Sequence, residues 1–335
     1  FFLKKNKQWK DSKNMKKVVI TGITGQDGVF LTNTISKNNK DCVIHGTTRD
    51  INGSEAFFKK LKSLGTNDFS KIQIEKVNLL NKKDVKEYLE YTNPGYIYNL
   101  TGPSSVYKSL KKPEKISQEI TGIFDNLIIS LIDAKNFPNF FQASSSEMFG
   151  DNGEGYQDEY GEFVPNSPYA VSKLKVHNKI QNLREEYEWK FISGIMFNHE
   201  SELRGDEYLI MKIIKYAKNL SPNKEKLTLG SLDYVRDWSF AGDITESMFL
   251  LNESNLNEDF VIGSGVGKKI SNILDIIFGE INKDWKEFLE IDKSLLREGD
   301  PEVLVSKPTK LMDSTNWKPA LDFESLILRC FNLSN

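Results

Sequence analysis

Short apolar runs alternate with longer amphipathic stretches from residue 17 onward. The first run, Val18–Ile20, is β-branched and leads through a glycine into a helical pattern that continues to about Ser36. Short apolar runs bounded by helix-length segments are typical of buried strands in a parallel sheet. The strands predicted on this basis are Val18–Ile20, Cys42–Thr47, Ile72–Val77, Tyr96–Leu100, Phe140–Ala143 and Lys190–Met196, and the helices between them include Lys82–Tyr91, Ile116–Ala134 and Tyr169–Tyr187.

This alternation predicts βαβ units with right-handed crossovers, and therefore an α/β fold with a Rossmann-type doubly wound parallel sheet. We expect residues 15–195 to form mainly the dinucleotide-binding domain. Residues 196–335 are expected to form mainly a smaller C-terminal substrate-binding lobe with interleaved segments, because the rhythm there is less regular. Residues 1–14, rich in Lys and Asn, are interpreted as an N-terminal extension. The later elements predicted are Tyr208–Leu220, Leu227–Leu229, Phe260–Ile262, Ile270–Ile281 and Phe323–Asn332.

Composition narrows the class of protein. Of the 335 residues, 39% are hydrophobic and 27% charged, and 45 Lys and Arg nearly balance 47 Asp and Glu. A net charge of −2 offers no strong attraction to nucleic acid or to an anionic membrane. The apolar runs are shorter than the ~20 residues that span a bilayer. Two cysteines without a CxxC pair predict neither a disulfide framework nor a metal site. We therefore expect a soluble, cytoplasmic protein.

A glycine-rich turn follows the first predicted strand and opens a helix. Glycines there let the backbone approach a pyrophosphate, which would sit at the helix N-terminus. The spacing is the variant typical of extended short-chain dehydrogenases, and the alternative is an ordinary β–α turn. The residues expected to hold the cofactor are Gly22, Thr24, Gly25, Gln26, Asp27 and Gly28.

Cofactor choice should be decided after the second predicted strand. Arg49 favours NADP, because a guanidinium can pair with a 2′-phosphate. The adjacent Asp50 could accept hydrogen bonds from the ribose of NAD, so NAD stays possible, and both residues could simply face solvent. Asn78 and Leu79, after the third strand, are expected near the adenine.

Tyr169 and Lys173 form a Tyr-xxx-Lys pair on a predicted helix, where residues four apart share a face. A free tyrosine, with a pKa of about 10, is a poor base at neutral pH. An ammonium ~5 Å away at an effective dielectric of ~20 favours the phenolate by about 3 kcal/mol, or roughly two pKa units. The spacing therefore predicts that Lys173 lowers the pKa of Tyr169, which then removes a hydroxyl proton as hydride leaves the same carbon.

Ser145 and Glu147 follow the predicted strand Phe140–Ala143, at the edge where open α/β sheets bind ligands. The Ser145 hydroxyl can hydrogen-bond a reacting oxygen. Glu147 would supply a second acid/base, able to take a proton from the carbon next to a newly formed ketone. The alternative is that Glu147 is a helix-start or surface carboxylate.

Several motifs together resemble the GDP-mannose 4,6-dehydratase family of the extended short-chain dehydrogenase/reductases. The likeness runs from about Lys17 to Pro319. The motifs are Gly22–Gly28, Tyr98-Asn99-Leu100, Gln142–Gly150, Ser167-Pro168-Tyr169 with Lys173, Phe197–Ser201 and Arg236-Asp237-Trp238.

The resemblance implies a lyase that converts GDP-D-mannose to GDP-4-keto-6-deoxy-D-mannose with bound NADP. Tyr169 would deprotonate the carbon-4 hydroxyl, Glu147 would remove the carbon-5 proton, and the carbon-6 hydroxyl would leave as water. Ser145 stands where the family has Thr and retains the hydroxyl, while Lys173 would hold the cofactor ribose. The resemblance also places Leu100 at the cofactor and Ser104, Asn198, Lys212, Arg236, Arg297 and Asp300 at the nucleotide sugar. His199, in the middle of a motif that follows a strand, is expected to hold loop geometry, and the alternative is that it acts as a base.

Some positions depart from the family pattern. Arg49-Asp50-Ile51-Asn52 replaces an Arg-Arg-Ser-Ser stretch that holds the 2′-phosphate and joins subunits into a tetramer, so NADP preference and tetramer formation are left open. The family's dimer packs the helices predicted at Ile116–Ala134 and Tyr169–Tyr187 into a four-helix bundle, which implies a homodimer or homotetramer here. A related GDP-hexose or GDP-heptose, a GDP-sugar reductase or epimerase, and a non-catalytic nucleotide sensor are the alternatives.

Overall fold

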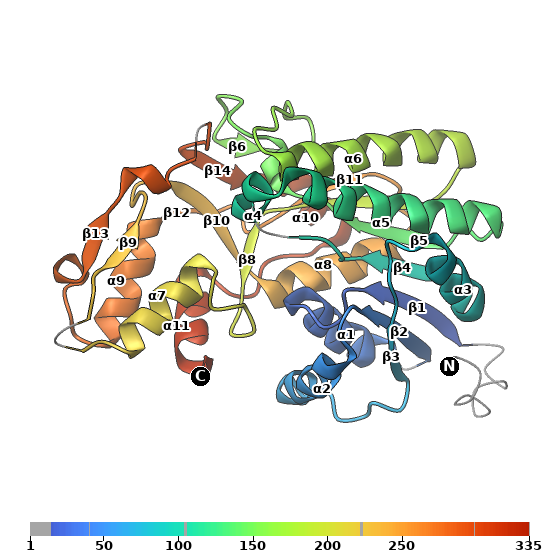
Figure 1. The fold of residues 1–335 in the computed structure, drawn as a ribbon, viewed down its shortest axis with the longest axis horizontal. Coiled ribbons are helices and arrows are strands. Elements are labelled where there is room, and N and C mark those ends of the chain that lie inside the picture. The colour runs from blue at the N-terminus through green and yellow to red at the C-terminus, as the bar shows by residue number, and fades with distance from the viewer. Residues whose placement is uncertain (1–14, 40, 104–105, 222–223, 298, 335) are drawn as a thin grey trace.

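The computed structural model describes residues 15–334 apart from residues 40, 104–105, 222–223 and 298, so the expected extension at residues 1–14 lies outside it. Figure 1 shows two parts, a larger one built on a wide parallel sheet and a smaller one that contains the C-terminus. Among the described residues, no helix is both long and apolar enough to cross a bilayer.

The larger part is a seven-stranded parallel sheet in the order β11-β7-β5-β4-β1-β2-β3. The sheet order reverses on either side of β1, which confirms the predicted doubly wound Rossmann-type fold. The strands are β1 (Lys16–Thr21), β2 (Cys42–Thr48), β3 (Ile72–Lys76), β4 (Tyr96–Asn99), β5 (Asn139–Ala143), β7 (Phe191–Met196) and β11 (Asp259–Ile262).

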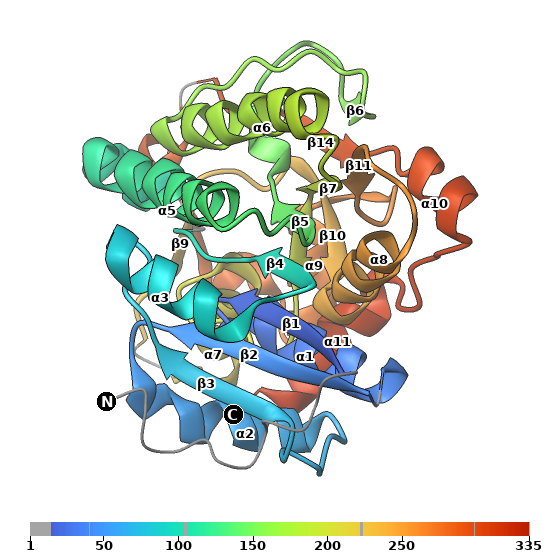
Figure 2. The same cartoon turned by 90° about the vertical axis from the view of Figure 1, so that its right-hand side faces the viewer.

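Both faces of this sheet are covered because successive side chains of a strand point to opposite faces. In β1, Val18 and Ile20 pack into one hydrophobic core and Val19 into the other. Helices α1 (Gln26–Asn38), α2 (Ser54–Ser63), α8 (Ala241–Glu253) and α10 (Thr309–Thr315) cover the first face, and α3 (Lys82–Thr92), α5 (Pro113–Asp133) and α6 (Pro168–Tyr187) cover the second. Figure 2 shows α5 and α6 side by side.

The smaller part combines short strands with three helices around a core of its own. A five-stranded sheet has the order β12-β10-β14-β6, with β8 paired to β10, and β13 pairs with β9. These elements are β6 (Tyr156–Gln157), β8 (Asn198–Glu200), β9 (Leu227–Leu229), β10 (Val235–Phe240), β12 (Gly267–Lys269), β13 (Leu289–Ile291), β14 (Val303–Ser306), α7 (Leu209–Lys218), α9 (Ile270–Glu280) and α11 (Phe323–Leu333).

The chain crosses between the two parts more than once. α8 and β11 come from beyond residue 195, yet they complete the larger sheet and its cover. In the other direction, β6 precedes residue 195 and pairs with β14 in the smaller part. Segments distant in sequence therefore meet along the carboxyl ends of the large sheet, where the candidate site lies.

Candidate active site

Tyr169 and Lys173 lie in the first turns of α6, and both residues are 7% exposed. The helix starts there because Pro168 occupies its first turn and the Ser167 hydroxyl accepts a hydrogen bond from the Ala170 amide at 3.1 Å. The Lys173 ammonium donates to the Ala143 carbonyl at 2.8 Å, which fixes α6 to the end of β5. Its nitrogen lies 5.7 Å from the centre of the Tyr169 ring. The two residues therefore share one face, as the spacing predicted.

The predicted lowering of the Tyr169 pKa is wrong for this structure. Burial raises the pKa of Tyr169 to about 12, and a hydrogen bond with the Ser145 hydroxyl only partly opposes it. Burial also lowers the pKa of Lys173 to about 8. The cause is desolvation, which disfavours the charged form of each group. Sequence spacing gave the separation of the two groups but not how deeply they are buried.

Glu147 lies in the 3₁₀ turn Ser146–Met148 directly after β5. The Ser145 hydroxyl caps this turn by accepting the Glu147 amide at 3.3 Å. The Glu147 carboxylate faces Arg297, with Oε2 and Nη1 3.2 Å apart, and its side chain is 21% exposed. Its charge acts on Tyr169 and raises the pKa of that phenol further, after burial. Glu147 therefore sits beside the tyrosine as part of a polar network, and it is not an isolated surface carboxylate.

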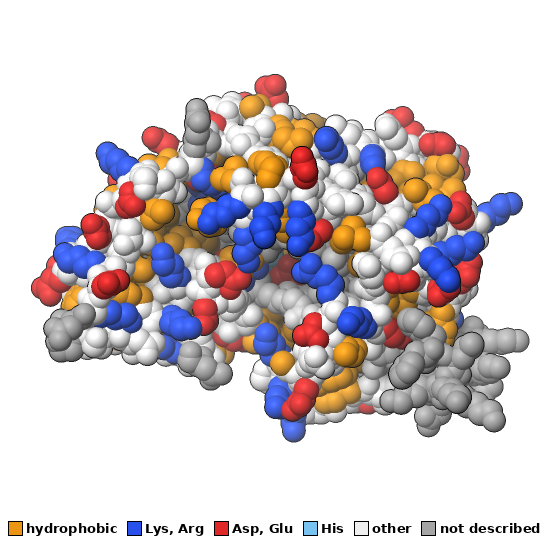
Figure 3. All heavy atoms as spheres, viewed as in Figure 1, with side chains coloured by type: hydrophobic (Ala, Val, Ile, Leu, Met, Phe, Trp, Pro, Cys, Tyr) orange, Lys and Arg blue, Asp and Glu red, His pale blue; other side chains and the backbone are white. Residues whose placement is uncertain are grey.

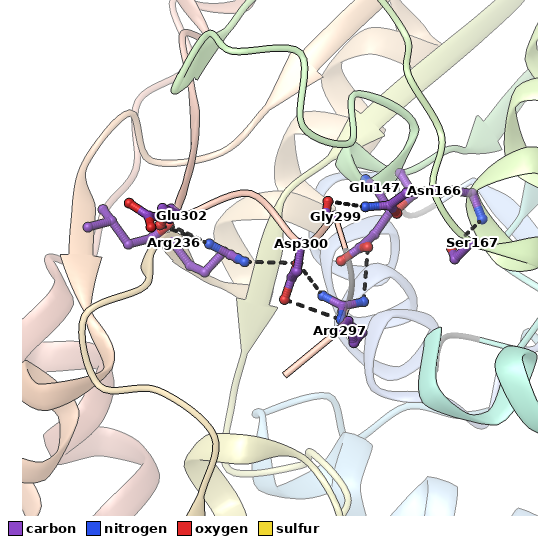
Figure 4. A network of polar contacts seen from close by, with 11 residues as sticks. Glu147, Asn166, Ser167, Arg236, Arg297, Gly299, Asp300 and Glu302 are labelled. Atoms are coloured by element: carbon purple, nitrogen blue, oxygen red, sulfur yellow. Dashed lines mark hydrogen bonds and ion pairs between the residues drawn. The ribbon is translucent and has the colours of Figure 1, made fainter. Parts of the chain in front are cut away.

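Arg236, Asp300, Arg297 and Glu147 form a continuous chain of ion pairs (Figure 4). Asp300 accepts from Arg236 Nη2 at 3.0 Å and from Arg297 Nη2 at 2.6 Å through Oδ1, and from Arg297 Nε at 3.2 Å through Oδ2. Arg236 comes from β10, and Arg297 and Asp300 come from the loop before β14. The structure thus joins three predicted sugar-nucleotide residues to the predicted base.

Two further residues position this chain of ion pairs, and the sequence analysis assigned neither of them a role. The Asn166 amide donates to the Gly299 carbonyl and so ties the loop before α6 to the loop that carries Arg297 and Asp300 (Figure 4). Gly299 has φ +70°, a conformation that favours glycine. The signal for Asn166 was its place one residue before the Ser167 cap.

The buried Asp237 is the second. Its carboxylate accepts from the amides of Ser264 (2.9 Å), Gly265 (2.9 Å) and Ser306 (3.2 Å) and from the hydroxyls of the two serines. These bonds join β10, β14 and the loop after β11. They hold β14 against the strand that carries Arg236.

The glycine turn has the geometry that a dinucleotide phosphate needs. Gly22 has φ +69°, and a Cβ on Gly28 would lie 2.3 Å from the Ile23 carbonyl oxygen. α1 begins after Gly25, which has no side chain to cap the first amides. Thr24 and Thr48 place their hydroxyls 3.4 Å apart beside the turn. This uncapped helix N-terminus fits a pyrophosphate.

The next residues are those predicted to face the ribose and the adenine of the cofactor. Arg49 is 81% exposed on its side chain and pairs with Glu119 of α5 at 3.5 Å. Asp50 uses its carboxylate to accept the Asn52 amide at 3.0 Å, capping a short 3₁₀ turn. The Asn78 side chain accepts a hydrogen bond from the Leu80 amide. Leu79 is buried, and its carbonyl accepts a hydrogen bond from the Asn126 side chain. Arg49 and Asp50 therefore both lie directly after β2, where cofactor choice was predicted, and each has a partner within the protein.

The remaining predicted residues lie at different distances from this chain of ion pairs. Leu100 follows β4, and its amide donates to the Thr21 hydroxyl at 3.1 Å. Asn198 lies in β8 opposite Trp238 of β10. Lys212 is exposed on α7 and donates to the Thr228 carbonyl at 3.2 Å, so this hydrogen bond lies within the smaller part and not in the ion-pair network. Ser104 lies outside the described residues.

Solved structures show the class of fold. The protein is similar to dTDP-glucose 4,6-dehydratase from Bacillus anthracis in complex with NAD, with a TM-score of 0.80 and 18% identity over 95% of this chain and 96% of that chain. It is also similar to UDP-glucose 4-epimerase from Thermus thermophilus in complex with NAD, with a TM-score of 0.80 and 20% identity over 95% and 98% of the two chains. This is the Rossmann-type short-chain dehydrogenase/reductase fold of nucleotide-sugar dehydratases and epimerases.

Within that class, the chain belongs to the GDP-mannose 4,6-dehydratase family, whose pattern matches residues 19–330. It is 31% identical to GDP-mannose 4,6 dehydratase 2 of Arabidopsis thaliana over 93% of this chain and 85% of the relative. It is 29% identical to the human GDP-mannose 4,6 dehydratase (92% and 88% covered) and 27% identical to the Vibrio cholerae protein (93% and 91%). The resemblance predicted from the motifs is confirmed.

Proposed function

We propose that the protein converts GDP-D-mannose to GDP-4-keto-6-deoxy-D-mannose without net oxidation or reduction. The observation that carries this proposal is the packing of the 3₁₀ turn that carries Glu147 against α6, which carries Tyr169, next to Ser145 and at the carboxyl ends of the large sheet. A simple reductase needs only one acid/base group, which transfers the proton of a single hydroxyl. A carboxylate next to it supplies the base that elimination of water requires.

Each proton transfer of the reaction is assigned to a residue of this protein. To take the proton of the carbon-4 hydroxyl, Tyr169 must be ionised, and a bound cofactor with a cationic nicotinamide would favour that phenolate against the effect of burial, which raises its pKa. The Ser145 hydroxyl hydrogen-bonds the carbon-4 oxygen. Glu147 then removes the carbon-5 proton, which the carbon-4 ketone has made acidic, and passes it to the carbon-6 hydroxyl, which leaves as water. Carbon 5 takes a proton from solvent when hydride reaches carbon 6. Arg297 holds the Glu147 carboxylate in place at 3.2 Å. A bound nicotinamide would supply hydride storage between carbon 4 and carbon 6.

We propose that the turn from Gly22 to Gly28 holds the pyrophosphate of this cofactor and that Lys173 faces its ribose. NADP is our preferred cofactor because Arg49 offers a guanidinium after β2, and NAD is the alternative. The Arg49 side chain is exposed and pairs with Glu119 at 3.5 Å, so it must exchange that carboxylate for a 2′-phosphate.

Replacing Arg49 by Ala tests that choice. We expect the variant to bind NADPH about 10-fold more weakly, because one charged phosphate contact is lost, while NADH binding changes less than about twofold. Fluorescence titration of both reduced cofactors measures the ratio. An equal loss for NADPH and NADH, or no loss for either, would contradict a role for Arg49 in cofactor choice.

We propose that Arg236 and Arg297 bind the diphosphate or guanosine side of the substrate and that Asp300 binds the sugar nucleotide. Two guanidinium groups converge on one carboxylate, and this is a geometry that a diphosphate can share. The wider surroundings are also basic, since Lys and Arg side chains gather around α4 (Val106–Lys111) in the middle of the face in Figure 3. Lys111, the last residue of α4, and Lys112 are both exposed.

The Arg236→Gln variant is expected to raise KM for GDP-mannose about 10- to 100-fold with a smaller change in kcat, because it removes a charged contact distant from the reacting carbons. Steady-state kinetics separates the two constants. Arg184→Gln is the control, since Arg184 pairs with Asp259 at 2.7 Å about four turns along α6 from Tyr169. A variant that loses kcat but keeps KM would show that Arg236 acts on the chemistry and not on binding.

The identity of the substrate is tested with a panel. GDP-, UDP-, dTDP- and CDP-hexoses are incubated separately with the protein, and mass spectrometry follows the loss of water. We expect dehydration with GDP-mannose and little with the other nucleotides. Dehydration of another GDP-hexose or of a GDP-heptose in preference to GDP-mannose would change the proposed substrate but support the proposed reaction, a dehydration. Inertness toward the whole panel would overturn the proposal.

We further propose a homodimer formed through α5 and α6, which lie side by side and expose Ile129 and Val171 on their outer surfaces. A two-helix face from each of two subunits can close into a four-helix bundle. Light scattering after size-exclusion chromatography measures the mass, and a monomer at micromolar concentration would contradict this arrangement.

A further inference from the structure

A carboxylate occupies the proposed phosphate-binding turn. Asp27 is in the first turn of α1, between Gly25 and Gly28. Negative charge at a helix N-terminus is favourable by itself, but a pyrophosphate placed at the same amides would be repelled by it. The turn therefore needs a cation that offsets Asp27 without occupying the place of the phosphate.

His199 is in position to be that cation. Its Nε2 lies 3.1 Å from Asp27 Oδ2, and its Nδ1 lies 2.7 Å from the Phe197 carbonyl oxygen. Carboxylate and carbonyl oxygens only accept hydrogen bonds, so both ring nitrogens must carry hydrogen for both contacts to form. A histidine with two N–H groups is an imidazolium. The hydrogen-bond geometry alone thus assigns a positive charge to His199.

The same strand is tied to the turn by neutral contacts. Gln26 donates to the His199 carbonyl at 3.2 Å and accepts from the Ser201 hydroxyl at 2.7 Å. β8, which contains His199, pairs with β10 two residues from Arg236. The turn and the strand next to the sugar-nucleotide residues are therefore held together by three side-chain contacts.

The charged groups around the pair balance one another. Glu200 in β8 and Arg204, four residues later, are 3.5 Å apart. The charge of Arg204 acts on both His199 and Asp27, and the charges of His199 and Asp27 act on Glu200. From α6, the buried Lys173 senses the charge of Asp27. Burial acts to lower the pKa of His199, but the charge and hydrogen bond of Asp27 outweigh it, so its pKa is raised.

We propose that His199 is a positioning residue that neutralises Asp27 in the phosphate-binding turn and thereby makes the turn able to accept the pyrophosphate of the cofactor. This inference rests on the proposed binding of a nicotinamide dinucleotide to residues 22–28. His199 acts through Asp27, so the effect of removing it must depend on whether the carboxylate is present.

A double-mutant cycle on cofactor binding tests this dependence. Dissociation constants for NADPH and NADH are measured by fluorescence in the absence of sugar nucleotide, for the wild type, His199→Asn, Asp27→Asn and the double variant. An unscreened charge several ångströms from the pyrophosphate should weaken binding about 10-fold in His199→Asn. The double variant should recover to within about threefold of the wild type, because the carboxylate is gone.

The pH dependence gives a second readout. The ion pair is complete below the raised pKa of His199 and is lost as pH rises through it, so wild-type cofactor affinity should fall over that range. The double variant, which lacks both groups, should not show this fall. His177→Asn is the matched control, because His177 is also buried and lies 3.5 Å from an aspartate, Asp259, outside the turn.

Two results would overturn the inference. One is wild-type affinity in His199→Asn. The other is a double variant as weak as His199→Asn, which would show that His199 acts directly or through the fold. Since binding is measured without substrate, a failure here is distinct from a failure to dehydrate GDP-mannose.

Discussion

Replacement of Glu147 by Gln is expected to lower the rate of dehydrated product formation by about 10²–10⁴-fold. The amide keeps the size of the side chain, and its oxygen can still accept from Arg297, which lies 3.2 Å from the carboxylate in the wild type. It cannot take the carbon-5 proton. Mass spectrometry of the product mixture measures the loss, and exchange of the carbon-5 hydrogen with deuterated water measures the missing proton transfer.

The first oxidation should survive in this variant. Tyr169, Ser145 and Lys173 are unchanged, so a single turnover should still show the absorbance of reduced nicotinamide, now persisting instead of decaying. Glu162→Gln, which alters an exposed glutamate in the nearby loop before α6, serves as the control and should leave turnover unchanged. Unchanged dehydration in Glu147→Gln would make that carboxylate incidental and would favour an epimerase or reductase.

Tyr169→Phe is expected to lower turnover by a similar factor, about 10²–10⁴-fold, but at the earlier step. Without the phenol oxygen the carbon-4 hydroxyl keeps its proton, so no ketone forms and the carbon-5 hydrogen never becomes acidic. The reduced nicotinamide that persists in Glu147→Gln should therefore not form in Tyr169→Phe, and exchange at carbon 5 should be absent, as it is in Glu147→Gln.

Substrate binding provides the check on this variant. The phenylalanine ring would occupy the buried position of the Tyr169 ring, so the dissociation constant for GDP-mannose should change little. Retention of carbon-5 exchange in Tyr169→Phe would contradict the assigned order of the two proton transfers, because exchange requires the ketone.

The sequence predicted the large sheet well for a physical reason. Its strands are short β-branched or aromatic runs such as Val18–Ile20, buried on both faces, and these stand out against helical segments. The strands of the smaller part do not. β8 (Asn198–Glu200) and β12 (Gly267–Lys269) are three residues long and largely polar, so nothing in their pattern distinguishes them from loops.

The residues of the site could be predicted from the sequence, but the contacts that join them could not. The family likeness supplied Arg236, Arg297 and Asp300, but their bridging through one carboxylate depends on the pairing of β10 with β14. That pairing is held by Asp237, whose buried hydrogen bonds come from two distant segments, the loop after β11 and β14. The pKa of Tyr169 was predicted with the wrong sign because burial is a property of the folded chain, not of a four-residue spacing.

GDP-mannose labelled with deuterium at carbon 4 tests the central claim most directly. The protein is incubated with the labelled sugar nucleotide in ordinary water, and the product is analysed by mass spectrometry and NMR. If Tyr169 and Glu147 act on one sugar, the product has lost one water and retains the deuterium, now at carbon 6. Deuterium recovered in solvent or in accumulated reduced nicotinamide, or an unlabelled carbon 6 in the product, would contradict the account.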